Sequence, residues 1–205
     1  MNNLDKNVQT VEAYNKNSEH YSAVFDSYPV RSGDIDRALK LNESGSTSIL
    51  ELGCGSGRDA EYIVSRVGVE NYTGNDASVS LIEKAREKVP KGNFIVDDMR
   101  EYSSHVKQFG IIFAFASLLH MKHEELIKIL QNCREMLKTR GILYVSSKYG
   151  EYREIEVQNL GNMKYYYSYM PEDIEKIMGD SFSTVFKIIH DSEYGPSFTL
   201  ALKKK

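Results

Sequence analysis

The sequence predicts an α/β protein with a doubly wound, mostly parallel seven-strand sheet that ends in a C-terminal antiparallel hairpin. Short apolar runs alternate with stretches of helical periodicity from residue 48 to residue 147, the pattern of parallel strands joined by helices. The run at 109–116 is almost continuously apolar, as expected for a strand covered on both faces. The last two runs, 184–189 and 197–202, leave no room for a crossover helix and therefore form a hairpin, which turns at Gly195-Pro196.

The individual elements follow from periodicity and from residues that start and stop helices. Apolar side chains at helical spacing predict an N-terminal helix over residues 8–25 and a second over 31–42. Ser78 can cap a helix that Pro90 ends, and Pro171 can open the last helix, over 172–178. Two more helices are expected at 59–67 and 123–138, the latter followed by Gly141 as a stop, and the five parallel strands at 48–52, 72–76, 93–96, 109–116 and 142–147.

Length and composition describe a soluble globular protein. The 205 residues form one expected domain (1–205), 41% hydrophobic and 27% charged, and no apolar run is long enough to span a membrane. The net charge of −3 argues against a nucleic-acid partner, because such proteins favour a basic surface. The N-terminus has no apolar leader, and neither Cys54 nor Cys133 has an evident partner, so we expect a cytoplasmic protein. Nothing in the sequence indicates an oligomeric state.

A glycine-rich loop follows the first expected strand. Glu51 ends this strand, and the loop continues with G-x-G-x-G spacing through Gly53, Cys54, Gly55 and Gly57. Glycines let a backbone turn sharply and approach a ligand closely, so we expect the loop to bind a ligand. Arg58 stands where a dinucleotide-binding G-x-G-x-x-G motif has its third glycine, which disfavours a nicotinamide cofactor.

Carboxylates follow the second and third strands, at the edge where open α/β sheets bind ligands. Asp76, followed by Ala77, can accept hydrogen bonds from a ribose diol, although an acid there can also cap the next helix. Asp98 can accept a bond from an exocyclic amine and Met99 can pack on a flat ring, although a solvated acidic turn is the alternative. With Glu51, these acids favour a cationic ligand, and an adenosyl group that carries a sulfonium and an α-amino group fits the pattern.

These motifs resemble those of the class I S-adenosylmethionine-dependent methyltransferases, which have a Rossmann-like fold. Residues 49–57 (ILELGCGSG) resemble the first motif, 72–78 (YTGNDAS) the second, whose acid holds the ribose, and 94–99 (FIVDDM) the third. Residues 109–120 resemble the fourth strand and its loop, and 137–143 the approach to the fifth strand. The chain departs from the family at Gly110, where an acid is common, and at Thr139-Arg140, where Pro-Gly is usual. The resemblance implies S-adenosylmethionine as cofactor and places Ala116 beside it.

The loop after the fourth strand is expected beside the transferred methyl group. His120 is the candidate general base, because an imidazole titrates near neutral pH. Its alternative role is to cap the following helix or to pack beneath the cofactor. His120 and His123 lack a third ligand at a recognisable spacing, so no metal site is expected.

Two segments outside the strand series are expected to cover the site. Residues 1–42 form an N-terminal helical cap, in which Tyr14 and Tyr21 share a helix face and contact either the cofactor or the core. Residues 148–170 form a substrate-side insertion, in which Lys148, Lys164 and Tyr166 are the candidate substrate residues. The tyrosine run of this insertion also suits an edge strand with half of its rings packed on the domain.

The sequence therefore predicts an enzyme that transfers a methyl group from S-adenosylmethionine to a nucleophilic oxygen, nitrogen or sulfur of a small-molecule acceptor. One alternative is a methyltransferase that acts on tRNA or another macromolecule. Another is a protein that binds S-adenosylmethionine without turnover. An NAD-dependent oxidoreductase is a further alternative, which Arg58 disfavours.

Overall fold

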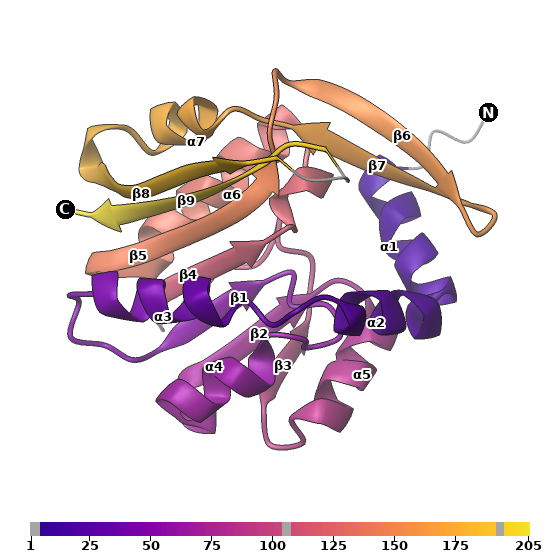
Figure 1. Ribbon diagram of the computed structural model, residues 1–205, viewed down its shortest axis with the longest axis horizontal. Helices are drawn as coiled ribbons and strands as arrows, with labels where there is room; N and C mark the ends of the chain where they lie inside the picture. Colours follow the sequence, from indigo (N-terminus) through magenta and orange to yellow (C-terminus); the bar gives the residue numbers. More distant parts are fainter. Residues whose placement is uncertain (1–4, 104–107, 192–194) are drawn as a thin grey trace.

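The computed structural model describes residues 5–103, 108–191 and 195–205. A seven-strand sheet has the order β3-β2-β1-β4-β5-β9-β8, and β6 and β7 form a separate two-strand sheet (Figure 1). The strands are β1 (Ile49–Leu52), β2 (Tyr72–Asp76), β3 (Asn93–Val96), β4 (Phe109–Phe115), β5 (Leu137–Lys148), β6 (Arg153–Asn159), β7 (Asn162–Ser168), β8 (Phe182–His190) and β9 (Ser197–Lys204). The helices are α1 (Lys6–Lys16), α2 (Ser18–Ser27), α3 (Ser32–Leu41), α4 (Ala60–Val67), α5 (Val79–Lys88), α6 (His123–Met136) and α7 (Pro171–Met178), with short 3-10 turns η1 (Val69–Asn71), η2 (Leu118–His120) and η3 (Gly179–Ser181).

The strand directions confirm the predicted sheet. Strands β1 to β5 are parallel, and β9 runs antiparallel to both β5 and β8. The chain builds β2 and β3 on one side of β1 and then returns to build β4 on the other side, so the strand order reverses between β1 and β4. Open α/β sheets bind ligands at such a reversal. The connection from β8 to β9, where a Gly195-Pro196 turn is predicted, lies partly outside the described residues.

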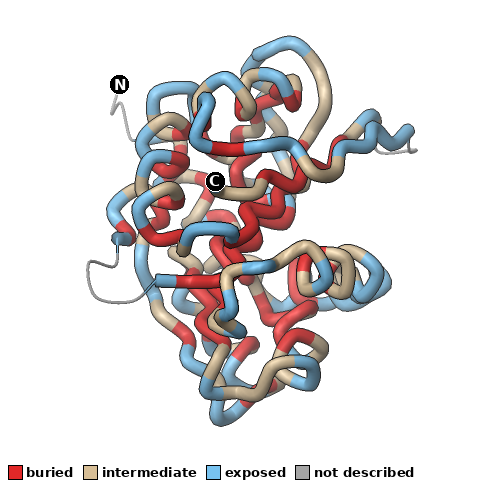
Figure 2. Tube along the Cα trace, turned by 90° about the vertical axis from the view of Figure 1, so that its left-hand side faces the viewer, coloured by how far each residue is buried: buried red, intermediate tan, exposed pale blue. Residues whose placement is uncertain are grey.

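Two apolar cores cover the two faces of the sheet. One core joins the sheet to α3, α4 and α5 through residues such as Ile35, Ile63 and Ile82. The other joins it to α6 and α7, and it also contains buried tyrosines of the β6–β7 region. Figure 2 shows the buried segments in the middle of the molecule and the exposed ones mostly at its periphery. The near-continuous apolar run of β4 is buried along its whole length, as expected between two cores.

The predicted N-terminal helix over 8–25 is wrong in one respect, because it consists of two helices. Helix α1 ends at Lys16 and α2 begins at Ser18, with Asn17 between them at φ −123°. The Asn17 side-chain amide donates to the Ala13 carbonyl, which satisfies an acceptor at the end of α1. The break lets α1 contact β7, while both helices contact α5.

The junction of α6 and β5 also differs from the prediction. The helix ends at Met136, and β5 begins at the next residue, so Gly141 lies inside the strand and does not stop the helix. A register irregularity between Phe109 and Ile111 accommodates the early start of β5. Arg140 adopts φ +63°, a left-handed conformation, which explains why this position usually carries glycine in the motif. Gly110 is required by packing, because a Cβ there would lie 2.3 Å from the Ser46 carbonyl oxygen.

The segment expected as a substrate-side insertion contains a β-hairpin. Strands β6 and β7 pair from Arg153–Ser168 to Asn159–Asn162, and Leu160 and Gly161 form the turn with φ +49° and +73°. Two successive positive φ angles are typical of a type I′ hairpin turn. The tyrosine run is therefore a strand, but it belongs to this separate sheet and not to the edge of the main one. The hairpin lies against α1, as Figure 1 shows at the upper right.

Candidate active site

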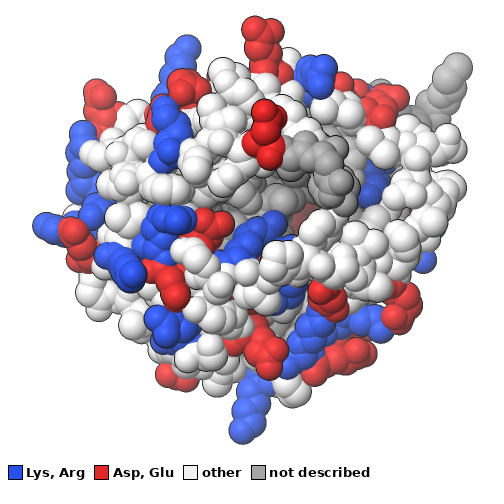
Figure 3. Space-filling view, in the orientation of Figure 1, with Lys and Arg blue, Asp and Glu red and all other residues white. Residues whose placement is uncertain are grey.

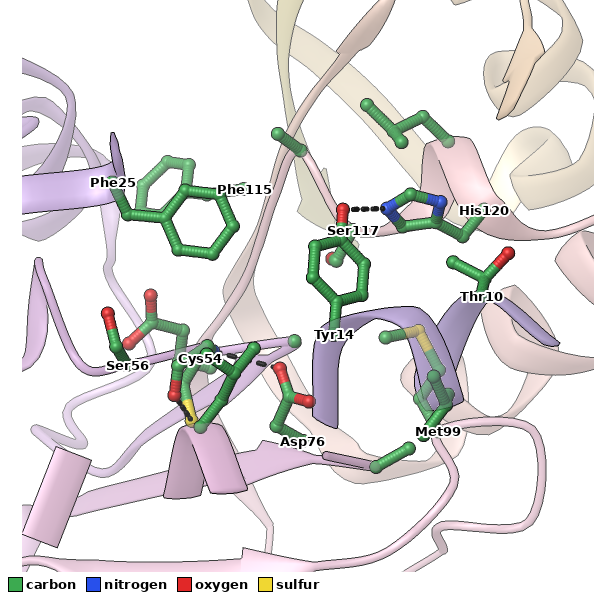
Figure 4. Close-up of a pocket in the computed structure, with 18 of the residues that line it drawn as sticks. Thr10, Tyr14, Phe25, Cys54, Ser56, Asp76, Met99, Phe115, Ser117 and His120 are labelled. Carbon is green, nitrogen blue, oxygen red and sulfur yellow. Dashed lines mark hydrogen bonds between the residues drawn. The ribbon is translucent and has the colours of Figure 1, made fainter. Parts of the chain in front are cut away.

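A cavity of about 290 Å³ lies where the strand order reverses, at the carboxyl ends of β1, β2 and β4. Side chains from α1, α2 and β7 also line it, and Figure 4 shows Tyr14 of α1 and Phe25 of α2. Most of the residues predicted for the site line it: Tyr14, Glu51, Gly53, Cys54, Gly55, Asp76, Ala77, Asp98, Met99, Ala116, His120 and Tyr166. The topology alone therefore gathers residues from four strand ends and the N-terminal helices around one space.

The glycine loop needs glycine for two different reasons. Gly53, Gly55 and Gly57 all have positive φ, at +71°, +55° and +75°. A Cβ at Gly53 would lie only 2.3 Å from the Cβ of Ser117, so the loop approaches the β4 loop too closely for any side chain. Gly57 does not line the cavity; a Cβ there would press on Ala85 of α5. Gly57 therefore sets the packing of loop on helix, whereas Gly53 and Gly55 border the cavity.

Asp76 ties the glycine loop to the end of β2. Its carboxylate accepts from the Gly55 amide at 2.9 Å and from the Ser78 amide at 2.8 Å (Figure 4 shows the first bond). Ser78, and not Asp76, caps α5, because its hydroxyl accepts from the Leu81 amide. Burial raises the pKa of Asp76, and its backbone donors oppose that shift. A carboxylate has about four lone-pair sites, so Asp76 can accept further bonds from a ligand.

A second group of charges lies on the opposite side of the glycine loop. Glu51 is 2% exposed and accepts from the Tyr72 hydroxyl at 2.6 Å. Burial, followed by the negative charge of Asp59, raises the pKa of Glu51 well above its usual range. Asp59 in turn accepts from the Arg31 amide and forms ion pairs with Arg31 at 2.8 Å and Arg58 at 2.6 Å. Carboxylates and guanidiniums at one end of a cavity can hold the ammonium and carboxylate of an α-amino acid.

Asp98 and Met99 line the cavity just after the carboxyl end of β3. Both oxygens of Asp98 accept hydrogen bonds from Arg100, from its amide at 2.9 Å and its guanidinium at 2.6 Å and 2.8 Å. Arg100 also pairs with Asp5 and Glu125, which fixes its position. The predicted amine acceptor is thus already held in place by a cation, and it keeps lone pairs for a further donor. Met99 presents its thioether to the loop, near Gly53.

The loop after β4 carries backbone strain at the cavity. Ala116 adopts φ +51°, which costs a non-glycine residue free energy and is found mainly at functional positions. Its amide donates to the Ser146 carbonyl at 2.9 Å. The Ser117 hydroxyl donates to the Leu52 carbonyl at 2.7 Å, which holds the loop against the end of β1. These two bonds fix the wall between the glycine loop and His120.

His120 makes two hydrogen bonds that define its protonation. Its Nδ1 lies 2.9 Å from the Tyr165 carbonyl, which can only accept, so Nδ1 carries the proton. Its Nε2 lies 3.1 Å from the Tyr14 hydroxyl and therefore accepts from it (Figure 4). Burial, aided by the charge of Lys164, lowers the pKa of His120 to about 4, although the Tyr165 carbonyl opposes the shift. His120 does not cap α6, because Lys122 is the N-cap residue and its amide donates to the Glu125 carboxylate.

Lys164 lies beside the cavity within a group of tyrosines. Its ammonium is 4.1 Å from the ring centre of Tyr21, 5.0 Å from that of Tyr14 and 5.5 Å from that of Tyr166. Tyr14 and Tyr166 line the cavity, whereas Lys164 and Tyr21 stand next to these rings without lining it. Burial lowers the pKa of Lys164 to about 8. We call Tyr14, Tyr21 and Tyr166 the tyrosine cage.

The fourth predicted residue that does not line the cavity is Lys148. It ends β5, pairs with Ser197 of β9 and is half-buried. The sequence analysis in turn missed several lining residues: Asn7, Thr10, Val11, Phe25, Arg31, Ser56, Asp59, Leu81, Phe115, Ser117, Leu119 and Met121. Phe115, Ser117 and Leu119 surround the predicted Ala116 and His120, so proximity along the chain could have indicated them. Arg31 has no local signal, because it precedes α3 and reaches the site through its contacts with Asp59, 28 residues further along the chain.

Within residues 5–103, 108–191 and 195–205, no three His, Cys, Asp or Glu side chains are grouped so as to hold a metal ion. In the same parts of the chain, none of the helices has the length and apolar character needed to cross a membrane.

Comparison with known proteins identifies the domain. A family profile described as "Methyltransferase domain" matches residues 49–141. The chain is 31% identical over 99 residues to the trans-aconitate 2-methyltransferase of Enterobacter sp. (strain 638), covering 48% of this chain and 38% of that protein. It is 26% identical over 143 residues to the malonyl-[acyl-carrier protein] O-methyltransferase 2 of Ilyobacter polytropus, covering 66% of this chain and 54% of that protein. The chain thus spans about half the length of these curated relatives, or less.

Solved structures share the fold over nearly the whole chain. The magnesium protoporphyrin IX methyltransferase of Synechocystis PCC 6803, solved with bound SAM, has a TM-score of 0.77, 14% identity and full coverage of both chains. The N-methyltransferase NodS of Bradyrhizobium japonicum WM9, solved with S-adenosyl-l-homocysteine, has a TM-score of 0.69, 17% identity and coverage of 98% of this chain and 99% of its own. The matched profile agrees with the strand order and with the glycine loop at its reversal: residues 49–141 are similar to a methyltransferase domain, and the chain shares the fold of methyltransferases solved with SAM or S-adenosyl-l-homocysteine.

Proposed function

We propose that this protein is an enzyme that transfers a methyl group from S-adenosylmethionine to a nucleophilic atom of a small-molecule acceptor. The observation that carries the proposal is the cavity at the strand reversal, where the backbone of Gly53 and Gly55 meets the buried acid Glu51 and the half-buried acid Asp76. Its volume of about 290 Å³ is near the lower end of the range for small-molecule sites.

The residues around the cavity fit the cofactor. Asp76 has lone pairs free for the ribose hydroxyls, and Glu51 is a buried acid whose oxygens can accept a hydrogen bond from an ammonium group. Arg31 and Arg58 provide guanidiniums at the same end for a carboxylate. When bound, S-adenosylmethionine supplies a methyl carbon activated by a sulfonium, so the protein needs chiefly to align a nucleophile with it.

The other residues of the site orient the acceptor and exclude water. Tyr14, from α1, and Tyr166, from β7, line the cavity and contact the His120 ring. Phe25 and Phe115 form an apolar wall (Figure 4). We propose that the N-terminal helices and the β6–β7 hairpin act together as the cap over this site. The ion pair of Lys6 with Glu154 and the bond from the Tyr165 amide to Thr10 join the two parts.

A small molecule suits this chain better as acceptor than a nucleic acid. On the face shown in Figure 3, acidic and basic side chains are interspersed over the surface. Non-specific binding of RNA or DNA favours a surface with a concentrated positive potential. The net charge of −3 does not favour such binding. The relatives named above act on small molecules or on an acyl group held by a carrier protein, by their names.

Calorimetric titration tests the cofactor first. We expect S-adenosylmethionine and S-adenosylhomocysteine to bind and NAD to give no heat, because position 58 is arginine and not glycine. Release of S-adenosylhomocysteine across a panel of small acceptors then tests turnover. Binding of NAD, or silence with both adenosyl-sulfur ligands, would refute the proposal. Cofactor binding without turnover on any acceptor would favour a non-catalytic binding protein.

A further inference from the structure

Lys164 is a buried cation that has no anionic partner in the described chain. The residue is 5% exposed, and none of the carboxylates in residues 5–103, 108–191 and 195–205 forms an ion pair with its ammonium. Burying an ammonium without a counter-charge is costly, and contacts with aromatic faces offset only part of that cost. The tyrosine cage therefore surrounds a positive charge for which the described residues supply no negatively charged partner.

A second unsatisfied donor lies in the same place. The Tyr21 hydroxyl is buried, and it has no hydrogen-bond partner among the described residues. Burial raises the pKa of the Tyr21 phenol, and the Asn159 side chain opposes that shift. Tyr21 is the ring closest to the ammonium, at 4.1 Å. An ammonium and a hydroxyl that both lack an acceptor indicate that the missing group is an anion.

The tyrosine cage adjoins the end of the cavity where the acceptor is expected. Tyr14 and Tyr166 contact the ammonium with their rings and also line the cavity. The His120 ring lies 5.5 Å from that of Tyr14 and 4.8 Å from that of Tyr166. The titratable groups facing Lys164 are thus Tyr14 of α1, Tyr21 of α2, Tyr166 of β7 and His120 of η2, none of which is negatively charged at neutral pH.

The site is poorly equipped to deprotonate an acceptor. The free lone pair of His120, on Nε2, is already taken by the Tyr14 hydroxyl, and Nδ1 donates to the Tyr165 carbonyl. The low pKa of His120, about 4, also makes it a weak base. An acceptor that is ionised before it binds needs no base, whereas an alcohol or a protonated amine does.

We propose that the acceptor is a carboxylate, that Lys164 and the Tyr21 hydroxyl bind its negative charge, and that methylation converts it to an ester. This inference rests on the proposed methyltransferase function. One carboxylate oxygen forms the bond to the methyl carbon as the methyl–sulfur bond breaks, and the electron pair of that bond stays on sulfur. The carboxylate loses its charge, the sulfonium loses its charge, and no proton is released. A single ammonium matches the single charge of a carboxylate better than the double charge of a phosphate monoester.

Binding to the complex with S-adenosylhomocysteine tests the anion site without turnover. Saturated protein is titrated with malonate, trans-aconitate and benzoate, with their methyl esters and with methyl phosphate. We expect at least one carboxylate to bind and its ester to bind far more weakly. Lys164→Met should weaken the binding of that carboxylate about tenfold or more, as expected for the loss of a charged hydrogen-bond donor. The affinity for S-adenosylhomocysteine should stay unchanged. Lys164→Arg keeps the charge and should keep much of the binding.

A control variant and the chemistry of the methylated product distinguish failure of the carboxylate proposal from failure of the methyltransferase proposal. Lys40→Met removes an exposed lysine of α3 and should change neither affinity. With labelled S-adenosylmethionine, the methylated product of the wild type should release methanol in mild alkali, as esters do. If S-adenosylhomocysteine fails to bind, the proposed function itself fails. Four other outcomes would show that the carboxylate proposal is wrong while the methyltransferase proposal stands. They are that S-adenosylhomocysteine binds but no carboxylate does, and that a carboxylate binds wild type and Lys164→Met equally. The other two are that methyl phosphate binds best and that the methylated product resists alkali.

Discussion

Substitution of Gly53 by alanine tests whether the close approach of the glycine loop to the β4 loop holds this part of the fold together. The left-handed φ of +71° costs an alanine about 1–2 kcal/mol. The new Cβ would lie 2.3 Å from the Ser117 Cβ and 3.2 Å from the Met99 methyl, and overpacking of this kind costs about 1–3 kcal/mol more. We therefore expect a loss of about 3 kcal/mol in the free energy of unfolding, a large part of the usual stability of a domain.

Gly45→Ala is the matched control. Gly45 has almost the same φ, +72°, but a Cβ there meets nothing within 4 Å. Its substitution should cost only the backbone term of about 1–2 kcal/mol. Urea unfolding followed by circular dichroism measures both variants, provided that the slope with denaturant stays the same. The difference between the two variants is then the cost of the contact with Ser117.

A double-mutant cycle makes the test sharper. Ser117→Gly removes the Cβ that the new alanine would strike, so Gly53→Ala should cost less in that background than in the wild type. Equal losses for Gly53→Ala and Gly45→Ala, or no rescue by Ser117→Gly, would refute the reasoning. Either result would mean that the two loops separate at no cost and that the close approach does not fix the cavity wall.

Three further predictions concern charges at the site. Asp76→Asn should weaken S-adenosylhomocysteine binding in calorimetry by about 1.5–3 kcal/mol, because a charged acceptor becomes neutral, and unchanged affinity would contradict its role toward the ribose. In the folded state the pKa of Glu51 is raised to about 8, so the unfolded chain loses this proton at a lower pH than the folded protein does. The free energy of unfolding of the wild type should therefore fall as pH rises from about 5 to 8. In urea unfolding, Glu51→Gln should lose this pH dependence of stability and should be more stable than the wild type at about pH 8. The same pH dependence in both proteins would show that Glu51 is ionised when folded. The pH profile of kcat/KM should be flat near pH 6–7, because the pKa of His120 is about 4, and should fall above about pH 8 as Lys164 loses its proton. Lys164→Arg should move that fall to higher pH, and a limb near pH 6–7 would instead identify His120 as a titrating base.

The order of strands and helices could be predicted from the sequence because each signal is local. The buried run of β4, the cap at Ser78 and the stop near Pro90 depend on residues close together along the chain, and all appear in the structure. The glycine loop was equally clear, since three glycines in five residues mark a left-handed turn whatever surrounds it. The parallel sheet followed from the alternation, because helical crossovers leave few other arrangements.

The errors arose where a distant contact decides the local structure. The break at Asn17 allows α1 and α2 to reach different partners, and the apolar spacing on either side continues without interruption. Strand β5 begins as soon as α6 ends, because it pairs with β4 from Leu137 onward. The tyrosine run was compatible with an edge strand, but its pairing with β6 in a separate sheet depends on the turn at Leu160-Gly161.

The sequence by itself determined the fold class and about half of the residues that line the cavity, because strand ends of a parallel sheet converge on one edge. Only the tertiary structure decided what those residues do to one another. It brings Arg31 to Asp59, sets the Tyr14 hydroxyl on Nε2 of His120 and surrounds the Lys164 ammonium with three tyrosine rings from α1, α2 and β7. Burial at these contacts lowers the pKa values of His120 and Lys164, and that burial depends on neighbours distant in the chain, which no local pattern records.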